Sequence, residues 1–182
     1  MNTGSSARWH LAKKVMSITA VITILVLTVY SVAFGGQRRL PVYYVKTDEK
    51  KVAISFDAAW GNEYTEGILD ILDTYDVKAT FFLVNFWAEE FPDDVRKIYE
   101  RGHDIGNHSA THPDMAGLAE EEIFNELAIT ADTIEELTGK RPVLFRPPFG
   151  SYSDRLIRCA EEENYTVIQW DIDICATAEN KI

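Results

Sequence analysis

The sequence contains little cysteine and little basic charge, and both shortages narrow the possible classes of protein. Its 182 residues include only two cysteines, Cys159 and Cys175, and they form no CxxC motif. Two thiols could pair outside a reducing compartment, but they make no disulfide framework, and we expect both to be free. Eighteen basic residues against twenty-nine acidic ones give a net charge of -11. Such a surface repels phosphate groups, so we expect no nucleic acid partner.

The composition is otherwise that of a folded domain. Hydrophobic residues make up 46% of the chain and charged residues 26%, a balance that excludes a disordered protein. The length suits one domain with a short extension, and there is no internal repeat or low-complexity tract. Much of the acidic charge lies in helix-like runs, which indicates a solvated surface.

The N-terminal region predicts export. Arg8, Lys13 and Lys14 precede an uncharged apolar run at residues 15–34, long enough to cross a hydrocarbon core of about 30 Å. We therefore predict a cytoplasmic tail at residues 1–14, a single transmembrane anchor at residues 15–34, and the rest of the chain outside the cytoplasm. The small residues at positions 31–33 leave a cleaved signal peptide open as the alternative.

The remainder alternates short apolar runs with longer amphipathic segments, after a polar stretch at residues 35–50 that we expect to be a linker. This alternation predicts βαβ units and parallel pairing, hence an α/β fold, in residues 51–182. Five predicted strands suffice for an open doubly wound sheet but not for a closed eight-stranded barrel. The predicted strands are 52–56, 79–84, 104–108, 143–145 and 166–171, and the predicted helices are 65–75, 93–100, 120–137 and 153–163.

Polar side chains follow three of the predicted strands. In parallel α/β folds, functional groups gather where strands end and loops begin. The candidates are Asp57 in SFDAAWG, then Asn107, His108 and His112 in GNHSATH, and Arg146 in FRPPFG.

Asp57 and Arg146 admit more than one interpretation. A charge at the end of an apolar strand needs a partner. Asp57 could cap a helix, form a structural salt bridge with Arg146, or be kept ionised by Arg146 for use as a general base. The two prolines after Arg146 fix the backbone, so we expect the arginine to be displayed at a rigid turn.

The two histidines are spaced as HxxxH. Neutral imidazoles are common ligands for zinc and similar ions, and this offset can bring both rings to one side. Two surface histidines in a polar loop would show the same spacing, so the pair alone leaves both interpretations open. His103 is expected to be an ordinary loop residue before a strand.

Together, these motifs resemble those of the polysaccharide deacetylases, the NodB-homology or carbohydrate esterase family 4 enzymes. Five collinear matches span residues 51 to about 173, and they are far more specific than the histidine pair. The segment FDAAWGNEYTEGILDIL and the N-terminal apolar run resemble those of the spore-associated PdaB-type branch. The matching segments are ISFD (54–57), KATFFL (78–83), GNHSATH (106–112), FRPPFG (145–150) and WDID (170–173).

The resemblance implies a distorted (β/α) barrel and a metal-dependent hydrolase that removes acetyl groups from cell-wall polysaccharide such as peptidoglycan or chitin, with sporulation as a setting. His108 and His112 would bind a divalent metal, zinc or similar, which would polarise the acetyl carbonyl. Asp57 would be the general base, and Arg146 would orient it. Pro147 and Phe149 would contact the substrate.

The sequence departs from the family pattern at two places. Ala58 stands where a second aspartate normally supplies the third metal ligand, which predicts weakened metal binding. After Asp173, residues 174–177 replace a Ser-x-Asp-Trp-like pattern, and no Leu-x-His motif for the general acid follows. We therefore expect a catalytic domain that is cut short at its C-terminus and an incomplete barrel.

These departures keep a second interpretation open, in which the chain is a catalytically inactive, membrane-anchored glycan-binding or structural protein. A missing general acid costs about 10²- to 10⁴-fold in rate. The aromatic residues Trp60, Trp87 and Phe149 could stack on sugar rings, or they could be packing residues.

Overall fold

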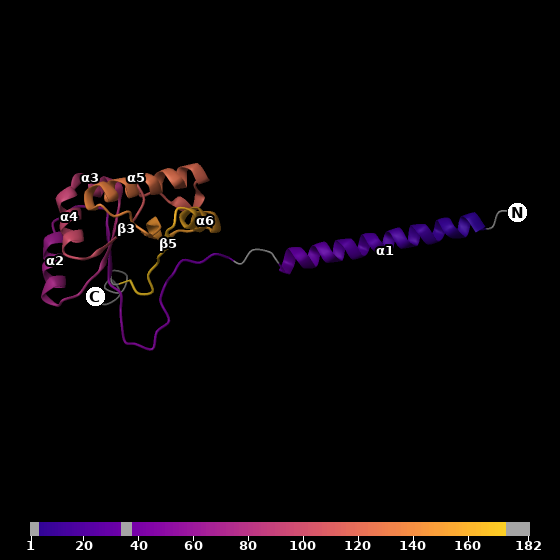
Figure 1. Cartoon of the computed structure of the whole chain (residues 1–182), viewed down its shortest axis with the longest axis horizontal. Helices are drawn as coiled ribbons and strands as arrows, with labels where there is room; N and C mark the ends of the chain where they lie inside the picture. The colour runs from indigo at the N-terminus through magenta and orange to yellow at the C-terminus, as the bar shows by residue number, and fades with distance from the viewer. Residues whose placement is uncertain (1–3, 34–37, 174–182) are drawn as a thin grey trace, which may run out of the picture. The chain divides into compact units, whose positions relative to one another are not determined.

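The computed structural model describes residues 4–33 and 38–173 (Figure 1). The chain divides into two units, Met1–Arg38 and Arg39–Ile182, and each is described by itself. Cys175 and the departure expected at residues 174–177 lie outside the described residues.

The first unit is one helix, α1 (Gly4–Ala33), which contains nearly all of the apolar run. Two of its hydroxyl side chains are satisfied within the helix, since Thr23 donates to the carbonyl oxygen of Thr19 at 2.9 Å and Thr28 to that of Ile24 at 3.0 Å. Among the described residues, no helix has both the length and the apolar character needed to cross a membrane. The predicted transmembrane anchor at residues 15–34 is thus without support from the structure.

The second unit contains a five-stranded parallel sheet in the order β1-β2-β3-β4-β5. The prediction of a parallel α/β fold is therefore confirmed. The strands follow one another in chain order, as in a (β/α) barrel, whereas a doubly wound sheet reverses its order at a switch point. The strands are β1 (Ser55–Ala58), β2 (Thr80–Leu83), β3 (Asp104–Asn107), β4 (Leu144–Phe145) and β5 (Thr166–Val167).

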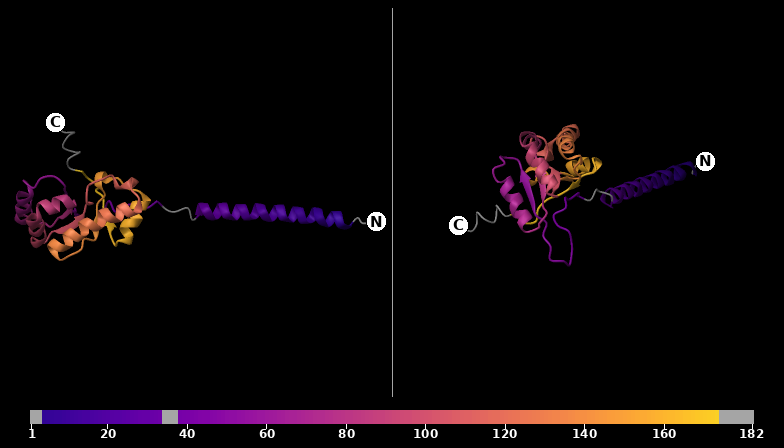
Figure 2. Two further views of the ribbon diagram at one scale, coloured as in Figure 1. Left: turned by 90° about the horizontal axis from the view of Figure 1, so that it is seen from above. Right: turned by 60° about the vertical axis from the view of Figure 1, so that its left-hand side comes forward.

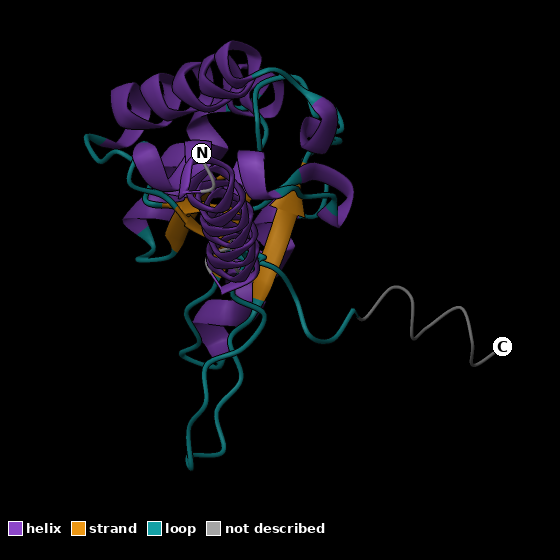
Figure 3. Ribbon diagram, turned by 90° about the vertical axis from the view of Figure 1, so that its right-hand side faces the viewer, coloured by secondary structure: helices purple, strands orange, loops and turns teal. Residues whose placement is uncertain are grey.

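Helices surround these strands (Figure 3). The four predicted helices are present with small differences at their ends, and α5 and α6 lie side by side in Figure 2. Sequence periodicity missed α3, because its six residues are too short to show a helical stripe. The helices are α2 (Thr65–Thr74), α3 (Asn85–Glu90), α4 (Pro92–Glu100), α5 (Glu120–Thr138) and α6 (Asp154–Glu162), with short 3₁₀ turns η1 (Met115–Gly117) and η2 (Pro148–Gly150).

The first strand begins later than expected. Val52 was predicted to start a buried strand, but its side chain is 87% exposed and pairing begins only at Ser55. The apolar run was therefore a poor guide to the strand's start. The shift carries Asp57 from the loop into β1, where it is paired in register with Phe82.

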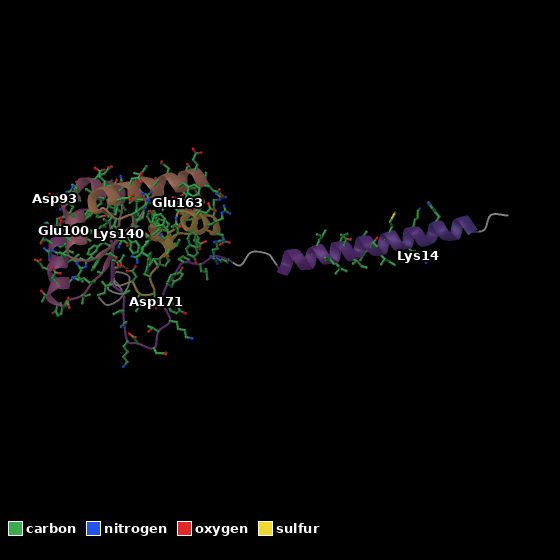
Figure 4. All side chains as sticks on the ribbon, in the orientation of Figure 1. Lys14, Asp93, Glu100, Lys140, Glu163 and Asp171 are labelled. Atoms are coloured by element: carbon green, nitrogen blue, oxygen red, sulfur yellow. The ribbon has the colours of Figure 1, made fainter. Side chains whose placement is uncertain are left out.

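The charged surface is as the composition indicated. Asp93, Glu100 and Glu163, labelled in Figure 4, are exposed on or next to the helices. The long acidic helix α5 buries an apolar stripe that includes Ile123, Leu127 and Ile134, and its acidic side chains lie mostly on the other faces. Its end is fixed by Gly139, whose φ of 74° is readily adopted only by glycine.

A short part of the expected linker is docked on the sheet. Val42 donates from its amide to the carbonyl oxygen of Val167 at 2.8 Å and accepts from the amide of Gln169 at 2.8 Å. Arg39 donates from its amide to Asp154 at 3.0 Å and pairs with Glu161. The backbone contacts of Val42 cover the edge of β5, which would otherwise present unpaired backbone groups.

Candidate active site

Three strand ends bring the predicted polar groups together. Asp57 comes from β1, His108 follows β3, and Arg146 follows β4. Parallel pairing aligns the ends of these strands at one edge of the sheet, with Leu83 opposite Asn107 and Asn107 opposite Phe145. The structure therefore brings these polar groups close together, although Asp57 and Arg146 lie far apart in the sequence.

Arg146 holds Asp57. The Nη1 atom of Arg146 donates to Oδ1 of Asp57 at 2.6 Å, and Nη2 donates to Oγ of Ser55 at 2.7 Å. The guanidinium also lies 4.1 Å from the centre of the Phe82 ring, a favourable cation–π position. Asp57 lies inside β1, so it does not cap a helix.

The environment of this ion pair is asymmetric. The Arg146 side chain is 5% exposed, whereas the Asp57 carboxylate is 36% exposed. Arg146 is therefore buried, which corrects the expectation that it is displayed at a turn. Pro147 and Pro148, which follow it, are buried as well. The cation is fixed inside the domain, and the carboxylate remains open to solvent.

Only glycine fits at position 106, close to the Arg146–Asp57 pair. A Cβ atom on Gly106 would lie 2.5 Å from Cδ1 of Phe82 and 3.1 Å from the carbonyl oxygen of Leu144. Such contacts are too close for any side chain. Gly106 thus lets β3 pass the Phe82 ring on which the Arg146 guanidinium rests.

His108 is the third member of the site. Its Nδ1 atom lies 2.7 Å from the carbonyl oxygen of Arg146, and a carbonyl can only accept, so Nδ1 carries the proton. Its Nε2 atom, with the lone pair, lies 3.7 Å from Oδ2 of Asp57. Burial lowers the pKa of His108, and the Asp57 carboxylate opposes this effect in part. Both facing atoms are acceptors, so a group between them must be a hydrogen-bond donor such as water, or a cation.

His112 lies beside His108. The two ring centres are 5.0 Å apart in an edge-to-face arrangement. The backbone of His112 is left-handed, with a φ of 57°, and its amide donates to Oγ of Ser109 at 3.0 Å. The pair is thus brought together by a tight loop and not by a helical turn.

Glu126, which sequence reasoning left out of the site, and Asn107, which it included, fix this loop. Glu126, on α5, accepts from the amides of Ala110 and Thr111, each at 2.8 Å, and from Oγ1 of Thr111 at 2.8 Å. Asn107 accepts from the amide of Ser109 at 2.8 Å and donates to the carbonyl oxygen of Leu127. No sequence signal distinguished Glu126 from the other acidic residues of its helix.

The aromatic candidates differ in how much of their surface is exposed to solvent. Trp87 is 2% exposed and donates from Nε1 to the carbonyl oxygen of Gly61 at 2.6 Å, so it belongs to the core. Trp60 and Phe149 are 78% and 70% exposed. Pro147 is buried before η2 and presents little surface to a substrate.

The donor set is incomplete for a resident metal ion. His108 has the tautomer of a typical ligand, with Nδ1 bound to a carbonyl and Nε2 free to coordinate. However, the nearest carboxylate, Asp57, is already engaged by Arg146, and position 58 is alanine. Within residues 4–33 and 38–173, no group of three or more His, Cys, Asp and Glu side chains is arranged to hold a metal.

Known proteins match this chain in sequence and in structure. A peptidoglycan-N-acetylglucosamine deacetylase from Bacillus cereus is 38% identical over 144 residues, which cover 79% of this chain and 49% of that protein. A CE4 family pseudoenzyme from Bacillus anthracis superposes with a TM-score of 0.73 at 36% identity, covering 77% of this chain and 50% of that one. A mutant of that pseudoenzyme with restored enzymatic activity gives the same TM-score at 38% identity, covering 77% of this chain and 52% of that one.

The chain spans about half the length of the curated relatives it matches, between 42% and 49% for the first three. The family model described as polysaccharide deacetylase matches residues 44–168, which include β1 to β5 and all of the polar groups above. Sequence, strand order and site geometry thus agree, and the chain belongs to the polysaccharide deacetylase family.

Proposed function

We propose that the domain removes acetyl groups from the N-acetylated amino sugars of peptidoglycan. The observation that carries this proposal is the Arg146–Asp57 pair with His108 beside it. The substrate is inferred from the Bacillus cereus relative, which is named as a peptidoglycan-N-acetylglucosamine deacetylase. A setting in sporulation is a prediction that rests on the PdaB-type resemblance alone.

The residues support water attack on an amide carbonyl. A water molecule against Oδ2 of Asp57 would give its proton to the carboxylate as its oxygen attacks the acetyl carbon. Arg146 fixes the orientation of the Asp57 carboxylate, because its guanidinium donates to both Asp57 and Ser55. His108, neutral and buried, presents the Nε2 lone pair to the same water. Protonated Asp57 is then placed to return the proton to the leaving amine.

Metal dependence is a further part of the proposal. A divalent ion such as zinc, when bound, would polarise the acetyl carbonyl and lower the pKa of water. His108 and His112 are the nitrogen donors the chain offers, and Ala58 supplies none. We therefore expect binding that is weak compared with a site that has three protein ligands.

A second function, glycan binding without turnover, has specific support. The donor set for a metal is incomplete within the described residues. A protein of similar structure from Bacillus anthracis is described as a CE4 family pseudoenzyme, which supports this alternative. Under this alternative, the same polar groups would hold the acetamido group but would not cleave it.

Acetate release from N-acetylated peptidoglycan, with and without added zinc, separates the two functions. We expect release that falls to background when Asp57 is replaced by asparagine, which keeps the size of the side chain but cannot act as the base. Glycan binding by the wild type with no acetate release under either condition would favour the second function.

The domain is also proposed to act outside the cytoplasm, where peptidoglycan is found. The support is the uncharged run at residues 15–34 and the basic residues before it. Protease treatment of intact cells, followed by detection of the full chain in membrane and soluble fractions, tests this. Protection of the domain from external protease would contradict it.

A further inference from the structure

Two exposed aromatic rings contact His112. Its ring centre is 6.2 Å from that of Trp60 and 4.7 Å from that of Phe149, each in an edge-to-face arrangement. Trp60 also contacts Phe86, at 5.4 Å between ring centres. These four residues form one continuous feature, here named the aromatic row, which comes from the loops after β1, β3 and β4 and from α3.

Burial does not explain this row. Trp60 and Phe149 expose 78% and 70% of their surface, so they gain little from removal from water. Phe149 also has a φ of 59°, an unfavourable backbone conformation for a bulky residue. Strained backbone that displays an apolar side chain is a feature of binding sites, where the strain is retained for function.

The loops that carry the two rings are held in place. The carbonyl oxygen of Gly61, next to Trp60, accepts from the buried Trp87 indole at 2.6 Å. The carbonyl oxygen of Gly150, next to Phe149, accepts from the side-chain Nε2 of Gln169 at 2.9 Å. The rings are thus pre-organised, which lowers the entropy lost when a ligand binds.

The row is continuous with the polar site. His112 is 5.0 Å from His108 between ring centres, and His108 is 3.7 Å from Asp57. Aromatic surface next to a few convergent polar groups is the usual lining of a small-molecule site. A pyranose matches both parts, because it has faces of C–H groups and a rim of hydroxyl and acetamido groups.

We propose that Trp60, beside His112, binds a sugar ring of the glycan together with Phe149, whose contact with the substrate the family resemblance already implies. This inference rests on the proposed function for the class of ligand, but not on catalysis. The inference gives Trp60 a role in substrate binding. Trp60 lies in the segment that departs from the family pattern at Ala58.

Calorimetric titration of the full chain with the N-acetylglucosamine tetramer tests the proposal. A mild detergent is needed because α1 exposes apolar side chains. Replacing Trp60 or Phe149 with alanine should weaken binding about tenfold each, as expected for a central aromatic contact. Trp60→Phe and Phe149→Tyr keep an aromatic face and should retain most of the affinity. Chelation of metal should leave binding in place.

Tyr75→Ala is the matched control, since Tyr75 is 75% exposed but follows α2 and precedes β2, at the opposite edge of the sheet. Its affinity should equal that of the wild type. The proposal is overturned if Trp60→Ala binds the tetramer as tightly as the wild type does, or if the wild type does not bind it.

Acetate release, measured in parallel, separates this proposal from the catalytic one. Binding that depends on Trp60 and Phe149 without any release would remove only the catalytic proposal. Acetate release together with a tetramer affinity that neither alanine variant changes would contradict only the proposal for Trp60 and Phe149.

Discussion

Arg146 contacts both Asp57 and His108, each with a different part of the residue. Its guanidinium donates to Oδ1 of Asp57 at 2.6 Å, and its carbonyl oxygen accepts from Nδ1 of His108 at 2.7 Å. One residue therefore fixes the orientation of the carboxylate and the tautomer of the imidazole together. A shift of the chain at Arg146 would disturb both groups at once.

The ion pair makes a prediction about stability. Asp57→Ala would leave the guanidinium of Arg146 buried without a carboxylate partner, with its hydrogen bond to Ser55 still in place. An uncompensated buried charge is costly, so we expect a loss of about 2–4 kcal/mol in the free energy of unfolding. Ser55→Ala removes the neutral partner and should cost about 1 kcal/mol. Urea denaturation of both variants measures the two losses of stability. Equal losses would contradict a stabilising ion pair between Arg146 and Asp57.

A second prediction concerns position 58. Ala58→Asp adds a carboxylate directly after Asp57, where the family pattern has its third metal ligand. Zinc affinity should rise at least about tenfold, because three protein ligands bind zinc far better than two. Ala53→Asp adds the same charge before β1 and serves as the control. Calorimetry with zinc measures both, and unchanged affinity in Ala58→Asp would mean that His108 and His112 are not metal ligands.

The loop that carries the two histidines depends on Glu126. Glu126→Ala leaves the amides of Ala110 and Thr111 without their acceptor, so the loop should lose its fixed conformation. We expect tetramer binding, and acetate release where it occurs, to fall by about tenfold, because small displacements at a binding site are costly. Glu136→Ala, an exposed change on the same helix, should have little effect. Similar behaviour of the two variants would show that the hydrogen bonds of Glu126 to the histidine loop are dispensable.

Two buried histidines predict a loss of stability in acid. Burial lowers the pKa of His108 and of His103 below the ordinary value of 6.5. As the pH falls below about 6.5, the unfolded chain takes up these protons before the folded one does, so folding becomes less favourable. Stability should therefore be complete above this pH and decline towards the lowered folded-state pKa values.

Thermal unfolding between pH 8 and 5 tests this sign. His103→Gln removes one of the two titrations, so its melting temperature should fall less steeply than that of the wild type. Nδ1 of His103 accepts from the amide of Ala79 at 3.3 Å, and glutamine keeps an acceptor for that contact. Identical slopes for the two proteins would exclude His103 as a source of the pH dependence.

The sequence was informative wherever the signal was local and repeated. The period of apolar residues located α2, α4, α5 and α6 to within a few residues, because an amphipathic stripe is written directly into the chain. It failed at α3, which is too short for a stripe, and at Val52, where apolar residues stay exposed. It also gave no sign that Val42 joins the edge of β5, since that contact spans more than a hundred residues.

The sequence by itself determined the parallel α/β fold, the family, and which polar residues stand at the ends of the strands. Only the tertiary structure decided that Arg146 turns inward against Asp57, that Glu126 holds the histidine loop, and that Trp60 and Phe149 flank His112. The physical reason is that each of these contacts joins residues distant in the chain, such as the pair 89 positions apart. Strand register and loop conformation bring them together, and neither is encoded in the spacing of any one motif.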